Sequence, residues 1–206
     1  MSELPMFPLG SVLFPYATLP LHVFEPRYRL MTRRVMEGDK EFGVVLIERG
    51  HEVGGGDVRS AFGTVARIVQ VTEAPDGRYG LVTVGVRRLE VVEWLPDDPY
   101  PRAEVRALED PPATAADTDA RTSVVAALTR ITEIARRIDA RVEPPPPLDT
   151  DPLRASYEAA ALAPIGSYDA QRVLAAPDAA TRLALLETLL HERAEEFEAR
   201  LGDDPT

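Results

Sequence analysis

The sequence predicts an α+β protein in which a β-rich amino-terminal part is followed by a helical part. Between residues 4 and 108, apolar residues recur with the period of two that is typical of strands. From about residue 121 they recur every three or four residues, as on one face of a helix. Pro111, Pro112 and a run of small polar residues separate the two patterns. We therefore expect a β-rich subdomain over 1–110, a linker over 111–120 and a helical subdomain over 121–206.

The composition is that of an ordinary globular protein. A chain of 206 residues with 45% hydrophobic and 28% charged residues can form one domain or two small ones. It has no cysteine, which excludes disulfides, thiolate catalysis and cysteine-ligated metals. No apolar run approaches the roughly 20 residues of a membrane span, and the first residues lack the basic region of a secretion signal. We expect a cytoplasmic protein that does not bind membranes.

The charge balance disfavours nucleic acid as a partner. The net charge is −11, and residues 1–110 alone contain 13 basic and 17 acidic side chains. Binding to DNA or RNA draws most of its affinity from lysine and arginine at the phosphates. An acidic chain without a basic cluster is therefore not expected to bind DNA.

The β-rich part contains one long predicted hairpin over 61–95. Its turn contains Pro75, Asp76 and Gly77, residue types that favour turns. In the second strand, over 79–95, one parity holds five apolar residues: Val82, Val84, Val86, Val92 and Trp94. Arg88 and Glu90 interrupt the alternation, which indicates a bulge or a bend from one sheet to another. Further strands are expected over 42–47 and 102–108.

Prolines divide the opening segment. Proline cannot donate to a strand ladder, so we expect short strand pieces and turns at edges or bulges here; the prolines are Pro5, Pro8, Pro15, Pro20 and Pro26. Pro26 suits the first position of a helix, because its missing N–H has no partner there. That helix carries the apolar stripe of Tyr28, Met31, Val35 and Met36 and ends before Gly38.

Four helices are expected in the second part. The first carries Val124, Leu128, Ile131, Ala135 and Ile138 on one face, and 144–147 form a stiff proline connection. Asp151 and Pro152 open the second, which ends near Leu162. The third lies near 168–175 and the last over 179–201.

Motifs for catalysis are missing or incomplete. The glycine run over 54–56 lacks the lysine and hydroxyl residue of a phosphate-binding loop, so we expect a mobile loop over 50–57. No Gly-x-Ser-x-Gly is present, and Lys40, the single lysine, lies in a polar turn where it is a poor base. His191 and Glu192 lack the second histidine of a zinc helix. We predict a non-enzymatic protein with no catalytic residue, metal or cofactor.

Several ordered motifs resemble the amino-terminal, substrate-binding domain of Lon proteases. The opening motifs are LPMFPL at 4–9, VLFP at 12–15 and LPLHVFEPRY at 19–28. The pattern continues with FGVVL at 42–46, GTVARI at 63–68 and GVRRL at 85–89. The later LAPI at 162–165 and RLALL at 182–186 resemble the helical part of that domain. The similarity extends over about residues 4–201.

This resemblance implies a fold and a function. It implies a compressed, PUA-like β pseudo-barrel followed by a helical bundle. Lon proteases carry an ATPase module and a serine–lysine protease module after this domain. The sequence contains neither, so we expect a stand-alone bacterial Lon-domain protein without protease activity. The implied partners are unfolded or misfolded polypeptides or another protein, with an adaptor role in protein quality control. The alternative is an RNA-binding PUA-like protein, which the acidic balance opposes.

The resemblance also indicates candidate binding residues at the junction before the first helix. These residues are Phe24, Glu25, Arg27 and Tyr28. Their structural interpretation is a helix cap, a core aromatic and an arginine paired with a sheet carboxylate. They also have a functional one, in which their exposed edge binds an extended chain through strand addition. We expect apolar side chains of the proline-broken opening to be partly unpaired and to join this surface. The candidate binding residues are Met6, Phe14, Phe24, Glu25, Arg27 and Tyr28.

Overall fold

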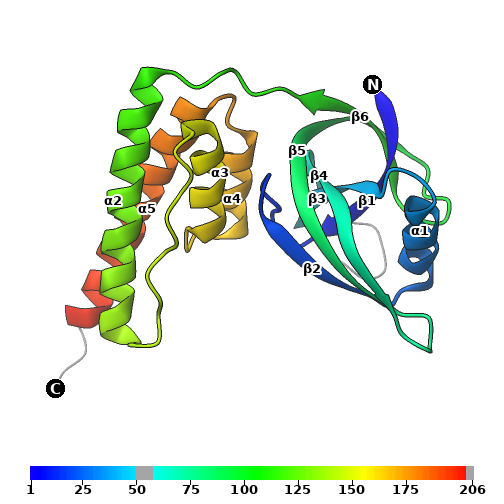
Figure 1. Cartoon of the computed structure of the whole chain (residues 1–206), viewed down its shortest axis with the longest axis horizontal. Coiled ribbons are helices and arrows are strands. Elements are labelled where there is room, and N and C mark those ends of the chain that lie inside the picture. The colour runs from blue at the N-terminus through cyan, green and yellow to red at the C-terminus, as the bar shows by residue number, and fades with distance from the viewer. Residues whose placement is uncertain (50–57, 203–206) are drawn as a thin grey trace. The chain divides into compact units, whose positions relative to one another are not determined.

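The computed structural model describes residues 1–49 and 58–202. The expected loop over 50–57 lies outside these residues. The chain separates into two compact units, Met1–Glu109 and Asp110–Thr206, which are described in turn (Figure 1).

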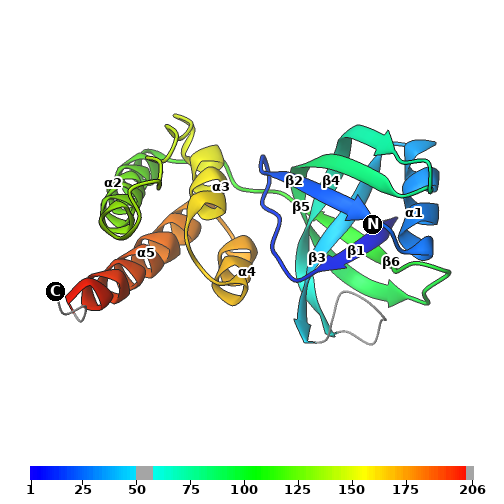
Figure 2. The same cartoon turned by 90° about the horizontal axis from the view of Figure 1, so that it is seen from below.

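The first unit is a closed β structure with one helix. Its elements are β1 (Ser2–Leu9), β2 (Thr18–Val23), α1 (Pro26–Met36), β3 (Glu41–Arg49), β4 (Val58–Glu73), β5 (Tyr79–Leu95) and β6 (Arg102–Leu108). The strands form one six-stranded sheet in the order β2-β5-β4-β3-β1-β6. An additional pairing between β5 and β6 closes five of them into a barrel and leaves β2 at the end of the sheet (Figure 2).

The second hairpin strand, β5, changes neighbours along its length, and its bulge lies just before Arg88 rather than at Arg88 and Glu90. Its first half pairs with β2 and its second half with β6, while β4 runs along its other side. Between the pairs Ala66–Gly85 and Val65–Arg87 the register shifts, which leaves Val86 as a bulge. Of the apolar parity noted in the sequence, Val92 is exposed and the others are half-buried, whereas Tyr79, Leu81 and Thr83 of the other parity face the interior. Valine suits either face of a strand, so its parity does not identify the core.

The prolines of β1 do not divide it into short pieces, contrary to expectation. Ser2–Pro5 pair antiparallel with β6, and Met6–Leu9 pair parallel with β3. Each half therefore pairs with a neighbouring strand on one side only. On the other side no strand requires a backbone donor, so proline is tolerated there. The result is one continuous eight-residue strand.

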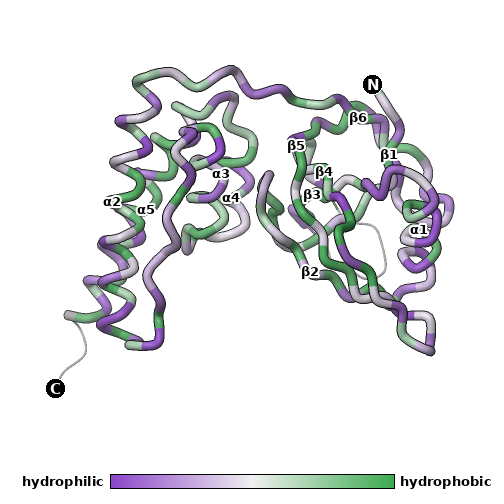
Figure 3. Tube along the Cα trace, viewed as in Figure 1, coloured by the Kyte–Doolittle hydropathy of each residue, from purple (hydrophilic) through white to green (hydrophobic). Residues whose placement is uncertain are grey.

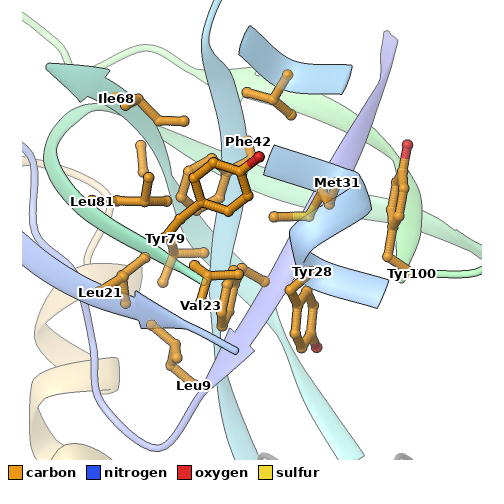
Figure 4. Close-up of a cluster of buried hydrophobic side chains, with 14 of the residues drawn as sticks. Leu9, Leu21, Val23, Tyr28, Met31, Phe42, Ile68, Tyr79, Leu81 and Tyr100 are labelled. Carbon is orange, nitrogen blue, oxygen red and sulfur yellow. The ribbon is translucent and has the colours of Figure 1, made fainter. Parts of the chain in front are cut away.

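A cluster of aromatic and aliphatic side chains fills the space between α1 and the strands. Pro26 opens α1 as predicted, and Tyr28, Met31 and Val35 are buried. Figure 4 shows Tyr28 and Met31 with Leu9, Leu21, Val23, Phe42, Ile68, Tyr79, Leu81 and Tyr100. The Phe7 ring stacks on the Tyr28 ring at 4.2 Å between centroids and joins β1 to the helix.

A close backbone contact fixes the segment between β1 and β2. A Cβ atom on Gly85 would lie 2.2 Å from the Phe14 carbonyl oxygen, so only glycine allows this approach. Next to it, the Thr64 hydroxyl donates to the Leu13 carbonyl at 2.5 Å. These contacts hold Leu13 and Phe14 against the barrel.

The second unit contains the four predicted helices. They are α2 (Ala115–Ile138), α3 (Pro152–Leu162), α4 (Ser167–Ala175) and α5 (Ala179–Gly202). Figure 3 shows hydrophobic and hydrophilic residues alternating along α2 and α5, the helices that contact each other most extensively. The expected face of α2 differs near its end, because Ile134 is buried and Ile138 is exposed.

The first of these helices begins earlier than we expected. The predicted linker extended to residue 120, but α2 begins at Ala115. The Asp117 carboxylate accepts from both the backbone N–H and the hydroxyl of Thr114. This cap satisfies groups at the helix start and extends the helix into the small polar stretch.

Candidate functional site

The edge strand β2 has an unpaired side. Among the described residues it pairs with β5 alone. The Ala17 carbonyl accepts from the Gly85 N–H at 2.9 Å, and the Leu19 carbonyl accepts from the Thr83 hydroxyl at 2.9 Å. Backbone groups alternate in direction along a strand, so the groups that face away from β5 are those of Thr18, Pro20 and His22. Outside the strand ladder, no hydrogen bond to Thr18 or His22 is found in the described part of the chain.

Phe24 projects from the end of this edge between two hollows. Its side chain is 55% exposed. A hollow of about 170 Å³ lies on the β1 side and is lined by Phe7, Leu9, Tyr28 and residues 20–25. A second, of about 360 Å³, lies on the side of the β4–β5 turn, and its lining includes Thr72, Arg78 and Tyr79 as well as His22 and Phe24. An exposed aromatic is thus flanked by two concave, mostly apolar surfaces.

The residues after Phe24 support this surface from behind. The Arg27 Nε donates to the Glu25 carboxylate at 3.0 Å, and the guanidinium carbon lies 4.5 Å from the Tyr28 ring centroid. Tyr28 in turn stacks on Phe7. Two details differ from the structural interpretation above. Arg27 pairs with Glu25, the residue just before the helix, and Glu25 occupies the cap position without a side-chain cap bond.

The structure divides the six candidate residues into an exposed and a buried group. Phe24 lies on the surface, and Glu25 and Arg27 are half-buried beside it. The expectation that Met6 and Phe14 are partly unpaired is wrong, because they are 0% and 4% exposed. Met6 belongs to a second core cluster with Val45, Val65, Leu89, Ala103 and Val105, and Phe14 lies in the segment held against Gly85. Tyr28 is only 4% exposed, and its contribution to the surface is that it lines the first hollow.

Sequence reasoning missed Pro20 and His22. Both lie on the outward face of β2 and line the hollows. A signal was present, since proline within a strand marks an edge.

Among the groups of the first unit whose pKa is shifted, Tyr79 and Glu41 lie within strands of the barrel. Burial raises the pKa of Tyr79, and its hydrogen bond to the Glu73 carboxylate adds to this, so the phenol at the second hollow stays neutral. Burial alone would raise the pKa of Glu41, but hydrogen bonds from Arg87 and Arg67 outweigh it and the pKa is lowered. Glu41 thus stays charged and joins β3 to β4 and β5.

Neither a metal site nor a membrane span is found in the described ranges. Within residues 1–49 and 58–202, no three His, Asp or Glu side chains are grouped so that they could hold an ion. None of the helices described is both long and apolar enough to cross a bilayer.

Nearly the whole barrel and most of the helical unit match a known protein family. The model of the ATP-dependent protease La (LON) substrate-binding domain matches residues 3–192. The chain belongs to this family. The resemblance predicted from the opening motifs is confirmed.

Relatives of this domain are found in full Lon proteases. Lon protease 2 of Myxococcus xanthus is 38% identical over 110 residues, which is 52% of this chain and 13% of that protein. Lon protease 1 of Herpetosiphon aurantiacus is 26% identical over 199 residues, 91% of this chain and 24% of that protein. The domain thus spans between about an eighth and a quarter of these relatives.

Solved structures confirm the α+β class. The Lon N-terminal domain protein from Xanthomonas campestris superposes with a TM-score of 0.67 at 28% identity, covering 91% of this chain and 98% of that one. The N-terminal domain of the Mycobacterium avium complex Lon protease has the same TM-score at 17% identity, covering 93% and 99%. The PUA-like type of barrel stays a prediction.

Proposed function

We propose that this LON-domain chain binds unfolded polypeptide segments at the β2 edge, with Phe24 as the main side-chain contact. The observation that supports this most is an exposed aromatic between two hollows, beside a strand whose outer backbone groups have no partner among the described residues. An unfolded segment offers partners for both features of this surface, since it has exposed apolar side chains and free backbone groups. A folded protein has already buried both.

The physical character of the site favours weak binding with little dependence on salt. Small, transient interfaces depend on a few aromatic contacts rather than on area. Apolar and backbone contacts are not screened by ions as exposed charge pairs are. At this edge Glu25 is paired with Arg27, and Arg78 at the second hollow is paired with Asp76, so the charges beside the site are partly balanced.

The proposal is tested with the full chain and a permanently unfolded probe, reduced and carboxymethylated lactalbumin. We expect Phe24→Ser to weaken binding about fivefold or more, since truncation of a central interface aromatic costs on the order of 1–2 kcal/mol. Tyr168→Ser is the matched control, because Tyr168 is 76% exposed but lies in the helical unit. Equal binding of the native, disulfide-bonded lactalbumin, or equal loss in both variants, would contradict the proposal.

We further propose that the chain acts without catalysis of its own, as an adaptor in protein quality control. The match is to the substrate-binding domain, and the sequence lacks a phosphate loop and a placed serine–lysine pair. Incubation with casein, with and without ATP, should release neither peptides nor phosphate. Turnover that copurifies with the chain and disappears in Lys40→Ala would overturn this part. A cytoplasmic location stays a prediction.

A further inference from the structure

We propose that the bound segment pairs with β2 as an antiparallel β-strand. Binding then requires those positions of the segment whose backbone N–H groups point toward β2. This inference rests on the binding function proposed above, and it adds the conformation and the register of the ligand. The site then selects for chains that can become extended, with little regard to their exact sequence.

The alternation in β2 couples backbone direction to side-chain direction. Thr18, Pro20 and His22 turn their backbone groups outward, away from β5, and their side chains are exposed. Leu21 and Val23 face β5 and bury their side chains in the core. Every outward backbone group of this edge thus belongs to a residue with a solvent-facing side chain.

The same relation between backbone direction and side-chain direction holds for an antiparallel partner strand. Residues directly opposite one another on two paired strands point their side chains to the same face. Ligand residues opposite Thr18, Pro20 and His22 therefore show their side chains to solvent and direct their N–H and C=O groups to β2. The intervening residues direct their side chains toward the hollow lined by Phe7, Leu9 and Tyr28, and their N–H groups away from β2.

Pro20 argues for a foreign strand rather than a second copy of this chain. If two β2 strands paired about a two-fold axis through Pro20, the two prolines would face each other with no N–H to donate. A different segment can donate its own N–H to the Pro20 carbonyl. The β2 edge therefore disfavours pairing with the β2 edge of a second copy. Residues that hinder such self-pairing are common on exposed edge strands.

The test uses a blocked nine-residue peptide with lysine at both ends and threonine alternating with valine between them. Valine should face the hollow and threonine the solvent. One derivative is N-methylated at three valines and the other at three threonines. We expect the valine derivative to keep its affinity within about threefold and the threonine derivative to lose at least about tenfold, since each hydrogen bond contributes about 1 kcal/mol.

Each other outcome has a definite meaning. Equal binding of the two derivatives, or a greater loss for the valine series, would overturn the antiparallel register. Failure of the unmodified peptide to bind, while carboxymethylated lactalbumin does, would overturn strand addition but not the binding function. Failure of both probes would overturn the binding function itself.

A change in the protein provides a second measurement. Thr18→Pro removes one outward N–H and leaves the hydrogen bonds to β5 in place. Thr18→Val is the matched control, because it keeps the N–H and changes only an exposed side chain. We expect the proline variant to bind the unmodified peptide about fivefold more weakly and the valine variant within twofold. Equal affinity of the two, with unchanged melting temperatures, would contradict the proposal.

Discussion

The Arg182 guanidinium, completely buried, donates from Nη2 to the Asp110 Oδ1 at 3.0 Å. Its Nη1 donates to the Ser156 hydroxyl at 2.9 Å, and its carbon lies 3.9 Å from the Tyr157 ring centroid. The Tyr157 hydroxyl completes the group by donating to the Asp110 Oδ2 at 2.5 Å. One arginine thereby joins α5, α3 and the first residue of the helical unit.

Removal of this arginine should strongly destabilise the helical unit. In Arg182→Met the Asp110 carboxylate loses its ionic partner, and breaking one side of a buried pair costs about 3–5 kcal/mol. The control is Arg130→Met, whose pair with Glu198 is nearly half exposed on both sides and contributes about 0–1 kcal/mol. Urea unfolding followed by circular dichroism measures both. Similar losses in the two variants would contradict the role assigned to the buried network.

Two glycines of β5 should respond in opposite ways to alanine. In Gly85→Ala the new methyl would lie 2.2 Å from the Phe14 carbonyl oxygen, so we expect a loss of about 1–3 kcal/mol. At Gly80 no atom of the described residues lies within 4 Å of the place that a methyl group would take, and Gly80→Ala should be neutral or slightly stabilising. Thermal unfolding of the two variants checks the comparison. An undiminished melting temperature for Gly85→Ala would show that the 12–15 segment is not held against β5.

Glu41 should contribute stability that depends on pH. Its pKa is lowered in the folded protein, because the hydrogen bonds from Arg87 and Arg67 outweigh the effect of burial. The stability it adds is therefore present above the unfolded pKa of about 4.3 and is lost as the pH falls through the folded pKa. We expect the difference in unfolding free energy between the native chain and Glu41→Gln to shrink from pH 6 to pH 3. A difference that grows on acidification would contradict the assignment.

No RNA complex should form at moderate ionic strength. α1 carries four arginines, but Arg27 pairs with Glu25, and the β-rich part as a whole has more acidic than basic residues. A mobility-shift assay with single-stranded and hairpin RNA at low salt tests this prediction. A shift that persists at about 150 mM salt, where phosphate contacts are already weakened, and disappears in Arg29→Ala, Arg33→Ala would favour the RNA-binding alternative.

The elements of the fold could largely be predicted, because each has a local signal. Pro26 and Asp151–Pro152 mark helix starts at the correct residues, and the turn around Gly77 closes the long hairpin. Strand pairing could not be predicted in this way. Ser2–Pro5 of β1 pair with β6, whereas Met6–Leu9 pair with β3. No local sequence pattern indicates this difference between the two halves.

The residues of the proposed site could be predicted from the sequence only in part. The motif around Phe24 contains the exposed aromatic of the proposed surface, yet Met6 and Phe14 are in the interior. An apolar residue near a proline can be either exposed or buried, and only the long-range contacts with Leu89 and Gly85 decide which. Pro20 was noticed as a strand breaker, but its meaning depends on knowing that β2 has no second neighbour among the described strands.

The pairing of Ser2 with Val105 has a consequence for the order of folding. The two residues are separated by nearly the whole β-rich unit, so the barrel closes through one of the longest loops it could form. Contacts of such large sequence separation slow folding, and barrels of this kind fold on a scale of milliseconds to seconds. On the ribosome, Met6–Leu9 can pair as soon as β3 is made, but Ser2–Pro5 must wait for the sixth strand. Until then this first half of β1 is itself an unpaired segment of the kind that the finished domain is proposed to bind.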